Sequence, residues 1–326
     1  MLTRIVECQL CPKRCRLEEG QRGDCRVRIN LDRKLQTLVY GNPCSVHIDP
    51  IEKKPLFHVL PATGSFSIAT AGCNLHCKFC QNWQISQRPA EETENYDLPP
   101  GKVVEAALKN RCRSIAYTYS EPIVFYEYMM DTAKLAKEKG LLNLWITAGF
   151  IEEKPLLELC PLMDAANVDL KGITEKYYQE MCSAQLAPIQ NAIITLRRRG
   201  VWVEITNLVI PTWNDSENDI RTLCRWIVDH VGADVPLHFS RFTPMHQLKN
   251  LPPTPHETLT LAREIAFQEG LHYAYVGNIP DHDGNNTYCP RDKKLLVRRI
   301  GYTILENHIQ EGKCPFCGID IPGIWE

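Results

Sequence analysis

Short apolar runs alternate with longer amphipathic segments between about residues 67 and 278 of the 326-residue chain. The runs are rich in β-branched and aromatic residues, as strands are, and they read SIATAG, SIAYTYS, LWITAG, ANVDLK, WVEITNLVIP, PLHFSRFTP and HYAYVGN. Between them apolar residues recur at a helical period, most clearly in 102–109, 123–139, 189–199, 216–231 and 254–269. This alternation predicts an α/β fold, with βα units around a parallel sheet of six or seven strands, open or rolled into a partial barrel.

The two ends of the chain lack this rhythm. Residues 1–65 are rich in cysteine, proline and basic residues, and residues 283–326 carry the cysteine-turn motifs CPRD and CPFCG. Segments this short rarely bury enough apolar surface alone, so we interpret both as small metal-stapled appendages. The predicted organisation is a Cys-rich N-terminal segment (1–65), a central α/β core (66–282) and a zinc-ribbon-like C-terminal segment (283–326).

Composition and charge narrow the class of protein. Apolar residues make up 44% of the chain, which is ordinary for a globular protein with a real core. The net charge of −2 gives no field that would gather nucleic acid or anionic lipid, and no stretch approaches the ~20 apolar residues of a membrane helix. Fifteen cysteines without an apolar leader indicate a reducing, cytoplasmic location, where clustered thiols bind metal more often than they pair.

Ten of the cysteines fall into clusters, whereas Cys44, Cys112, Cys160, Cys182 and Cys224 stand alone and are expected to be small core residues. The N-terminal cluster supplies four thiolates within 18 residues, and zinc or a second iron-sulfur cluster would suit it: Cys8, Cys11, Cys15 and Cys25. The C-terminal cluster offers only three thiolates, Cys289, Cys314 and Cys317. Zinc could be retained there with Asp292 or His308 as the fourth ligand, or it could be lost.

The central cluster lies in GCNLHCKFCQNW, residues 72–83, where Cys73, Cys77 and Cys80 follow a C-x3-C-x2-C pattern directly after an apolar run. On a helix these offsets would align three buried structural cysteines on one face, but Gly72 and the polar neighbours favour a loop. A zinc site completed by His76 or by a distant residue is a second interpretation. The third is an iron-sulfur cluster with one iron that no side chain ligates, which leaves a position open for chemistry.

Polar residues follow the predicted strands at the end where parallel sheets carry their working groups. Glu121 follows the second strand and Thr147 ends the third, while Asn207 lies within the fifth. His238 and Arg241 on the sixth strand stand at offsets that straddle the sheet, so we expect at most one of them to face inward.

The cysteine motif, with Phe79 before its last cysteine, resembles the signature of radical S-adenosylmethionine (SAM) enzymes. That resemblance implies a radical SAM core of partial-barrel type in residues 66–282. It also implies a [4Fe-4S] cluster on Cys73, Cys77 and Cys80 whose open iron is chelated by SAM. In YTYSEP (117–122), Glu121 and Ser120 then stand where the superfamily receives the methionine ammonium, although the usual glycines are absent.

Further segments are similar to pyruvate formate-lyase activating enzymes. ANVDLKG (166–172) resembles their Asp-Leu-Lys segment, which lies near the SAM carboxylate, and TAGF (147–150) and NLVIPTWND (207–215) match segments that line the nucleotide pocket. By this resemblance the residues that bind SAM are Glu121, Ser120, Thr147, Asp169, Lys171 and Asn207. An ion pair between Asp169 and Lys171 with a purely structural role is the alternative.

The resemblance to the radical SAM component of the AmmeMemoRadiSam system extends over nearly the whole chain. It rests on segments such as DPIEKKPLFHVLP, LHFSRFTP, YVGNIP and CPFCGIDIPGIW. This family implies Memo-like and AMMECR1-like proteins as partners and an electron donor such as flavodoxin or ferredoxin, with no nucleic-acid or membrane partner.

The function expected from these residues is that of an oxidoreductase. It would cleave SAM reductively to a 5′-deoxyadenosyl radical, which abstracts hydrogen from an unidentified substrate. A glycyl-radical-enzyme activase is one alternative. A zinc-binding adaptor protein, from another class, is the second, and the near-neutral charge and βα core disfavour it.

Overall fold

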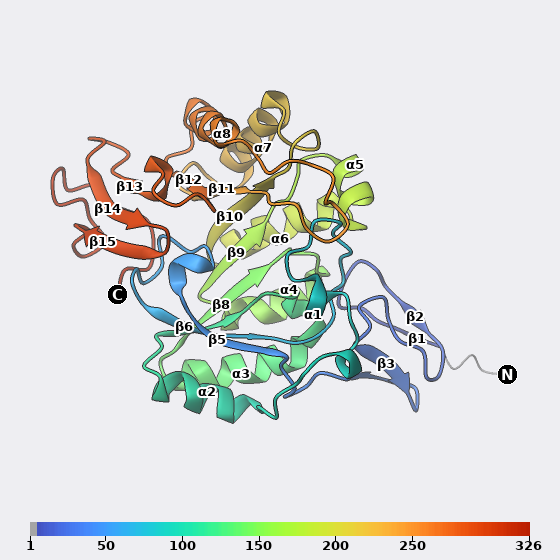
Figure 1. The fold of residues 1–326 in the computed structure, drawn as a ribbon. Helices are drawn as coiled ribbons and strands as arrows, with labels where there is room; N and C mark the ends of the chain where they lie inside the picture. The colour runs from blue at the N-terminus through green and yellow to red at the C-terminus, as the bar shows by residue number, and fades with distance from the viewer. Residues whose placement is uncertain (1–4) are drawn as a thin grey trace.

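A computed structural model describes residues 5–326 of the chain. Its centre is a sheet built from β5 (Ser45–Pro50), β6 (Gly64–Ala69), β7 (Ser114–Tyr117), β8 (Leu142–Thr147), β9 (Ala165–Asp169), β10 (Trp202–Val209), β11 (Leu237–Arg241) and β12 (Ala274–Gly277). The strand order is β12-β11-β10-β9-β8-β7-β6-β5. Strands β6 to β12 are parallel, and β5 pairs antiparallel with β6 at one edge. This mainly parallel sheet confirms the predicted α/β fold (Figure 1).

Helices cover the sheet along the chain between its strands. They are α1 (Trp83–Ser86), α2 (Pro100–Lys109), α3 (Tyr126–Glu138), α4 (Glu153–Leu159), α5 (Glu175–Tyr177), α6 (Leu186–Arg198), α7 (Glu217–His230) and α8 (His256–Gln268). The shorter turns are η1 (Ile51–Lys53), η2 (Ala90–Glu92), η3 (Pro122–Phe125), η4 (Cys160–Leu162), η6 (Asp283–Asn285) and the π-helix η5 (Tyr178–Cys182). Figure 1 shows α2 and α3 near β5 and β6, and α7 and α8 near β11 and β12.

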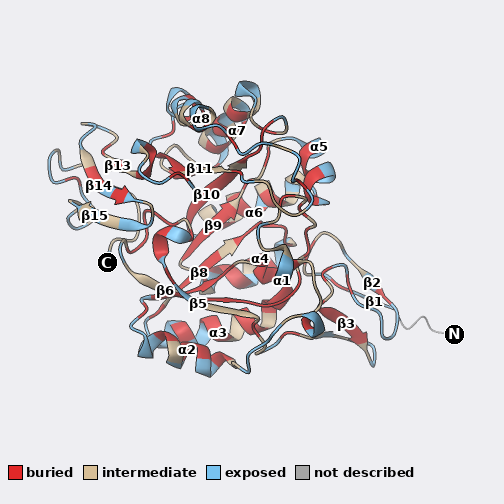
Figure 2. Cartoon of the chain, in the orientation of Figure 1, coloured by how far each residue is buried: buried red, intermediate tan, exposed pale blue. Residues whose placement is uncertain are grey.

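The two faces of the strands have different surroundings. Ile205 of β10 and Phe239 of β11 are fully buried in the same apolar core cluster as Ile193 of α6. Alternate residues point to the other face, and Thr206, which pairs with His238 in the parallel register, faces a cavity described below. Burial on both faces explains why these strands read as nearly continuous apolar runs (Figure 2).

The predicted helices are present with small shifts at their ends. Ser216 caps α7, since its hydroxyl accepts a hydrogen bond from the Asp219 amide at 3.1 Å. The sequence pattern did not indicate α4 or the π-helix η5. Both are short, and η5 closes its turn through wider hydrogen bonds that a 3.6-residue period does not describe.

The N-terminal segment consists of two small hairpins that precede β5. The first pairs β1 (Val6–Glu7) with β2 (Arg16–Leu17), and the second pairs β3 (Arg28–Leu31) with β4 (Lys34–Thr37). Strand β5 lies inside the predicted segment 1–65, yet it forms the edge of the central sheet. Residues 1–4 of that predicted segment lie outside the described residues.

The C-terminal segment is a three-stranded sheet of β13 (Thr287–Tyr288), β14 (Leu295–Ile300) and β15 (Thr303–Asn307). Its tail returns to the core, because the Ile324 amide donates to the His58 carbonyl at 2.7 Å. The buried guanidinium of Arg299 donates to the Phe57 carbonyl at 2.9 Å and lies 4.2 Å from the Phe57 ring centroid. These contacts therefore fix the C-terminal sheet to the segment that follows β5.

Across residues 5–326, every helix is too short or too polar to cross a bilayer.

Gly72 joins the N-terminal segment to the core by a close approach. Its φ is +89°, and a Cβ atom added there would lie 2.5 Å from the Cys25 carbonyl oxygen. Gly200 has a similar φ of +80° but open space around its Cα. We expect Gly200→Ala to lower the free energy of unfolding by about 1–2 kcal/mol through backbone strain alone. Gly72→Ala should lower it by about 1–3 kcal/mol more, because the carbonyl must move.

Urea unfolding of both variants beside the wild type would measure this difference. Equal losses in the two variants would show that Cys25 does not pack against Gly72 as described.

Candidate active site

The loop between β6 and α1 carries the three central cysteines, so the helical reading of their spacing does not apply. The π-helix η5 holds this loop through backbone hydrogen bonds. The His76 amide donates to the Cys182 carbonyl at 2.9 Å, and the Lys78 amide donates to the Met181 carbonyl at 3.0 Å. Asn74 adds a side-chain hydrogen bond to the Phe150 carbonyl at 2.9 Å. The loop is therefore shaped by residues far from it in sequence.

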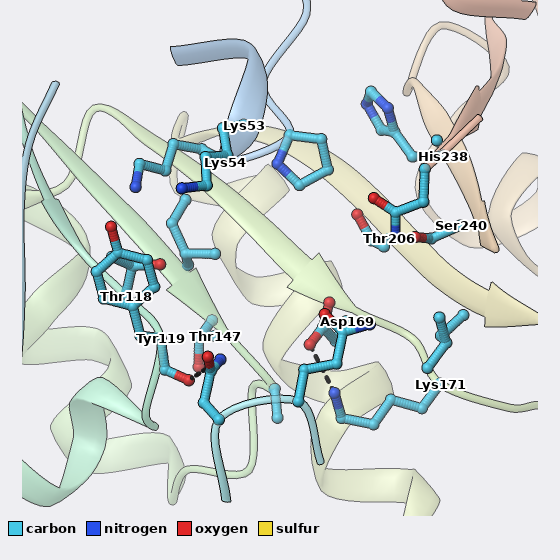
Figure 3. Close-up of a pocket in the computed structure, with 18 of the residues that line it drawn as sticks. Lys53, Lys54, Thr118, Tyr119, Thr147, Asp169, Lys171, Thr206, His238 and Ser240 are labelled. Carbon is cyan, nitrogen blue, oxygen red and sulfur yellow. Dashed lines mark hydrogen bonds and ion pairs between the residues drawn. The ribbon is translucent and has the colours of Figure 1, made fainter. Parts of the chain in front are cut away.

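A cavity of about 680 Å³ opens at the carboxyl ends of the parallel strands. Cys73, Cys77 and Cys80 form part of its wall, so the three thiols share one open space. Figure 3 shows Asp169 and Lys171 at one end of this cavity and Lys53 and Lys54 at the other. Its size lies within the range of about 300–1,000 Å³ that is typical of small-molecule sites.

The three thiols suit a cluster better than a single ion. Among residues 5–326, no group that includes these cysteines brings three possible ligand atoms within 4.8 Å of one another, whereas a group near the C-terminus does. A cluster spreads its ligands over separate irons and so needs them farther apart. Burial raises the pKa of Cys73 and of Cys80, which keeps both thiols neutral until a metal binds.

Cys182, which the sequence left as a lone core residue, lies beside Cys77. A hydrogen bond between the two side chains lowers the Cys77 pKa, although burial of Cys77 opposes this, and the positive charge of Lys171 lowers it further. Cys182 does not line the cavity. Cys182 therefore contacts Cys77 on the side away from the cavity and does not occupy the space in front of the three thiols.

Glu121 is buried, and its carboxylate takes three hydrogen bonds from the chain itself. The Thr147 hydroxyl donates at 2.6 Å, the Ala148 amide at 2.7 Å and the Ile123 amide at 3.4 Å. Burial raises the Glu121 pKa to about 7 despite these donors. A carboxylate has about four acceptor positions, so one remains for a ligand. Glu121 thus fixes the end of β8 and can still accept one further donor from the cavity.

Asp169 and Lys171 form an ion pair of 2.5 Å on the cavity wall. Burial lowers the Lys171 pKa, but the negative charge and hydrogen bond of Asp169, together with the nearby Cys77 and Cys182, raise it overall. The Lys171 ammonium lies 5.9 Å from the Phe79 ring centroid, within the cysteine motif. It is therefore a permanent positive charge near the thiols, and it would offset the negative charge that three thiolates bring.

The structure brings five of the six predicted SAM-binding residues to the cavity, namely Glu121, Ser120, Thr147, Asp169 and Lys171. Asn207 is not part of the lining. It points away from the cavity because its neighbours Thr206 and Leu208 face inward, and its amide donates to the Leu170 carbonyl at 2.8 Å. Its contact with the chain positions the end of β9.

His238 lines the cavity, whereas Arg241 donates from Nε to the Thr254 carbonyl at 2.9 Å. This agrees with the expectation that at most one of them faces inward. His238 Nε2 lies 2.6 Å from a carboxylate oxygen of Glu204, which is completely buried. Burial would raise the Glu204 pKa, but the contact with His238 lowers it.

The sequence analysis did not predict the residues at the far end of the cavity. Lys54 is buried, and burial lowers its pKa to about 8 even though it pairs with Asp49 at 2.5 Å. Tyr119 also donates to Asp49, and Lys53 completes this wall. A charged pair inside EKKP, directly after a strand, was a signal for this site, as was Glu204 inside the apolar run WVEITNLVIP.

Known proteins are similar to this chain over the region that holds these cysteines and strands. The model of the radical SAM superfamily matches residues 67–224. The uncharacterized protein MJ0808 of Methanocaldococcus jannaschii is 44% identical over 320 residues, which cover 97% of this chain and 95% of that protein. The chain belongs to the radical SAM superfamily. It is a radical SAM enzyme, and membership implies a [4Fe-4S] cluster and SAM as its cofactors.

More distant radical SAM relatives are similar over part of the chain. The pyruvate formate-lyase-activating enzyme of Clostridium pasteurianum is 24% identical over 168 residues, which cover 48% of this chain and 66% of that enzyme. The structure of a radical SAM methyltransferase from Sphaerobacter thermophilus superposes with a TM-score of 0.50 at 16% identity, covering 65% of this chain and 66% of the other. The second likeness supports the partial-barrel fold.

The C-terminal segment holds a second group of metal-ligating residues. The ligand atoms of Cys289, Asp292, Cys314 and Cys317 all lie within 4.8 Å of one another. The Cys289 and Cys317 sulfurs are 3.5 Å apart, and Asp292 Oδ2 is 3.8 Å from the Cys314 sulfur. His308, the alternative fourth ligand, instead contacts Glu306 at 3.1 Å. Asp292 therefore stands where the fourth ligand of a tetrahedral ion belongs.

Cys182 tests whether the central site uses only three cysteines. Cys77→Ala should lose the iron of the central site, whereas Cys182→Ala should retain it, because Cys182 does not face the cavity. Iron and sulfide analysis after anaerobic reconstitution would count about four irons at this site if the cluster is present. Loss of that iron in Cys182→Ala would assign the residue as a fourth ligand.

Asp292 provides the matching test at the C-terminus. Asp292→Ala should weaken zinc binding by about tenfold or more, since it removes one of four ligands, while His308→Ala should leave it unchanged. Competition with a chromophoric chelator would measure both affinities. Weaker binding in His308→Ala alone would exchange the roles of the two residues.

Proposed function

We propose that the chain is a radical SAM oxidoreductase that acts on a substrate bound in the cavity at the strand ends. The observation that carries this proposal is the opening of Cys73, Cys77 and Cys80 onto one cavity of about 680 Å³. The three cysteines would hold a [4Fe-4S] cluster, and SAM would lie beside it against Glu121 and Lys171. When bound there, the cluster supplies one electron that cleaves SAM to a 5′-deoxyadenosyl radical, which takes hydrogen from the substrate.

The chain's own residues divide the cavity between cofactor and substrate. The free acceptor position of Glu121 suits the methionine ammonium, and the positive charge of Lys171 suits a carboxylate. The far end presents Lys53, Lys54 and His238. Asp49 pairs with both lysines, and Glu52 also lines this end. The lysine ammonium groups and the other hydrogen-bond donors there would suit a substrate with a polar, hydrogen-bond-accepting group, such as a carboxylate or phosphate.

The partners follow from the sequence resemblance to the AmmeMemoRadiSam system. It supports Memo-like and AMMECR1-like proteins as partners and a flavodoxin or ferredoxin as the electron donor. Similarity to pyruvate formate-lyase-activating enzyme supports a second candidate, a glycyl-radical-enzyme activase. The two candidates differ in where the radical ends, on a small molecule or on a protein.

Anaerobic assays test the proposal. Reconstituted protein with dithionite should convert SAM to 5′-deoxyadenosine and methionine, and Cys77→Ala should reduce this activity to background. Cys112→Ala is the matched control, because Cys112 is also buried but does not line the cavity. Chromatographic measurement of 5′-deoxyadenosine gives the rates. Wild-type protein that holds a cluster and binds SAM but never cleaves it would contradict the proposal.

Electron paramagnetic resonance of the same reaction, run with a purified partner protein, separates the two candidates. A stable protein glycyl radical would favour the activase, and turnover of an added small molecule without one would favour the oxidoreductase.

A further inference from the structure

A second cavity lies behind the central cysteine loop and is lined by all four N-terminal cysteines. Cys8 and Cys11 follow β1, Cys15 precedes β2 and Cys25 precedes β3. The hairpin that carries them is closed by backbone hydrogen bonds, including one from the Cys8 amide to the Cys15 carbonyl at 2.9 Å. Two hairpins and the loop between them thus bring four thiols around one small space.

These thiols are gathered less closely than the ligands of a single zinc ion are. Four sulfurs at about 2.3 Å from zinc lie about 3.8 Å from each other and leave no room for water between them. Here the four thiols line a cavity of about 20 Å³ together with other side chains, among them Lys13 and Arg28. Within the described chain, no three of these sulfurs come within 4.8 Å of one another, in contrast to the C-terminal group. The N-terminal and C-terminal cysteine groups therefore differ in how closely their ligand atoms are gathered.

The walls of the cavity suit a group with negative charge. Lys13 and Arg28 line it, and the Arg28 side chain is only 5% exposed. Its Nε atom is buried without a hydrogen-bond partner among the described residues, although the guanidinium also pairs with Glu127. The Asp24 amide donates to the Cys15 sulfur at 3.5 Å. Buried cations and amide donors to sulfur stabilise and tune clusters held by thiolates.

Gly23 lies between two of the thiols. A Cβ atom added to it would be 3.7 Å from the Cys15 sulfur and 3.8 Å from the Cys25 sulfur. The backbone therefore passes close to both sulfurs. A larger residue would crowd any group bound there.

The small cavity and the central site share a wall. Asn74 lines the small cavity, and Cys73, the preceding residue, lines the large one. Gly72 lies against the Cys25 carbonyl, and His76 Nε2 is 2.8 Å from Asp24. Groups bound at the two sites would be separated by little more than this loop.

We infer that Cys8, Cys11, Cys15 and Cys25 bind an auxiliary [4Fe-4S] cluster that passes electrons to the central site. With four protein ligands this cluster has no open iron, so it is a carrier and not a catalyst. One electron enters from an external low-potential flavin or iron-sulfur protein and leaves for the central cluster, without a change in bonds. The relay role rests on the proposed function, whereas binding of the cluster does not.

The triple variant Cys73→Ala/Cys77→Ala/Cys80→Ala tests cluster binding on the full chain. After anaerobic reconstitution it should keep about four irons and four sulfides, and its dithionite-reduced form should show the paramagnetic signal of a cubane. Further replacement of Cys8 and Cys11 by Ser should abolish both, while replacement of Cys44 in their place should not. One zinc with no iron in the triple variant, or only two irons, would overturn the inference.

The relay is tested in protein that keeps its central cysteines. Cys8→Ser/Cys11→Ser should retain the central irons and SAM cleavage with dithionite, and lose SAM cleavage driven by reduced flavodoxin. Undiminished cleavage with flavodoxin would overturn the relay role. Absence of SAM cleavage from the wild type would instead count against the proposed function, with the iron count of the triple variant unaffected.

Discussion

The geometry of the central site depends on how one loop is held between distant parts of the chain. The loop from Gly72 to Asn82 has almost no regular structure, so its own hydrogen bonds cannot fix three thiols around a common space. On one side the π-helix accepts two of its backbone amides. On the other side Gly72 rests on the Cys25 carbonyl. Met181 and Cys182 are the last two residues of the π-helix, and the last carbonyls of a helix have no partner within it, which explains how they can accept these bonds.

Two buried carboxylates organise the rest of the cavity. Glu121 ties η3 to the end of β8, and Glu204 receives the amides of Phe57 and His58 at 3.0 and 2.8 Å as well as His238. Each is an expensive group to bury, and each is offset by several donors. Their common effect is to hold the polar lining of the cavity in fixed positions before any ligand arrives.

The fold could be predicted from the sequence because parallel strands that are buried on both faces appear as apolar runs, and amphipathic helical segments separate these runs. All seven predicted strands are present as β6 to β12, while β5, whose exposed and buried residues do not alternate regularly, was missed.

The site was predictable where residues follow strands, as with Glu121 and Lys171. Lys54, Glu204 and Cys182 were not predicted. Glu204 and Cys182 gain their roles from His238 and Cys77, which are distant in sequence, and the partner of Lys54, Asp49, belongs to the strand β5 that was missed. Asn207 lies outside the cavity lining because side chains alternate between the two faces of a strand with a period of two, which a motif match does not take into account.

The turn between β14 and β15 places Gly301 and Tyr302 on the wall of the large cavity. This turn belongs to the same small sheet whose loops bring Cys289, Asp292, Cys314 and Cys317 together. An ion bound by those residues would brace a hairpin whose turn forms part of the cavity wall. Binding or loss of this ion would then change the shape of the cavity, and with it the molecules that fit there, although the ion itself takes no part in the radical chemistry.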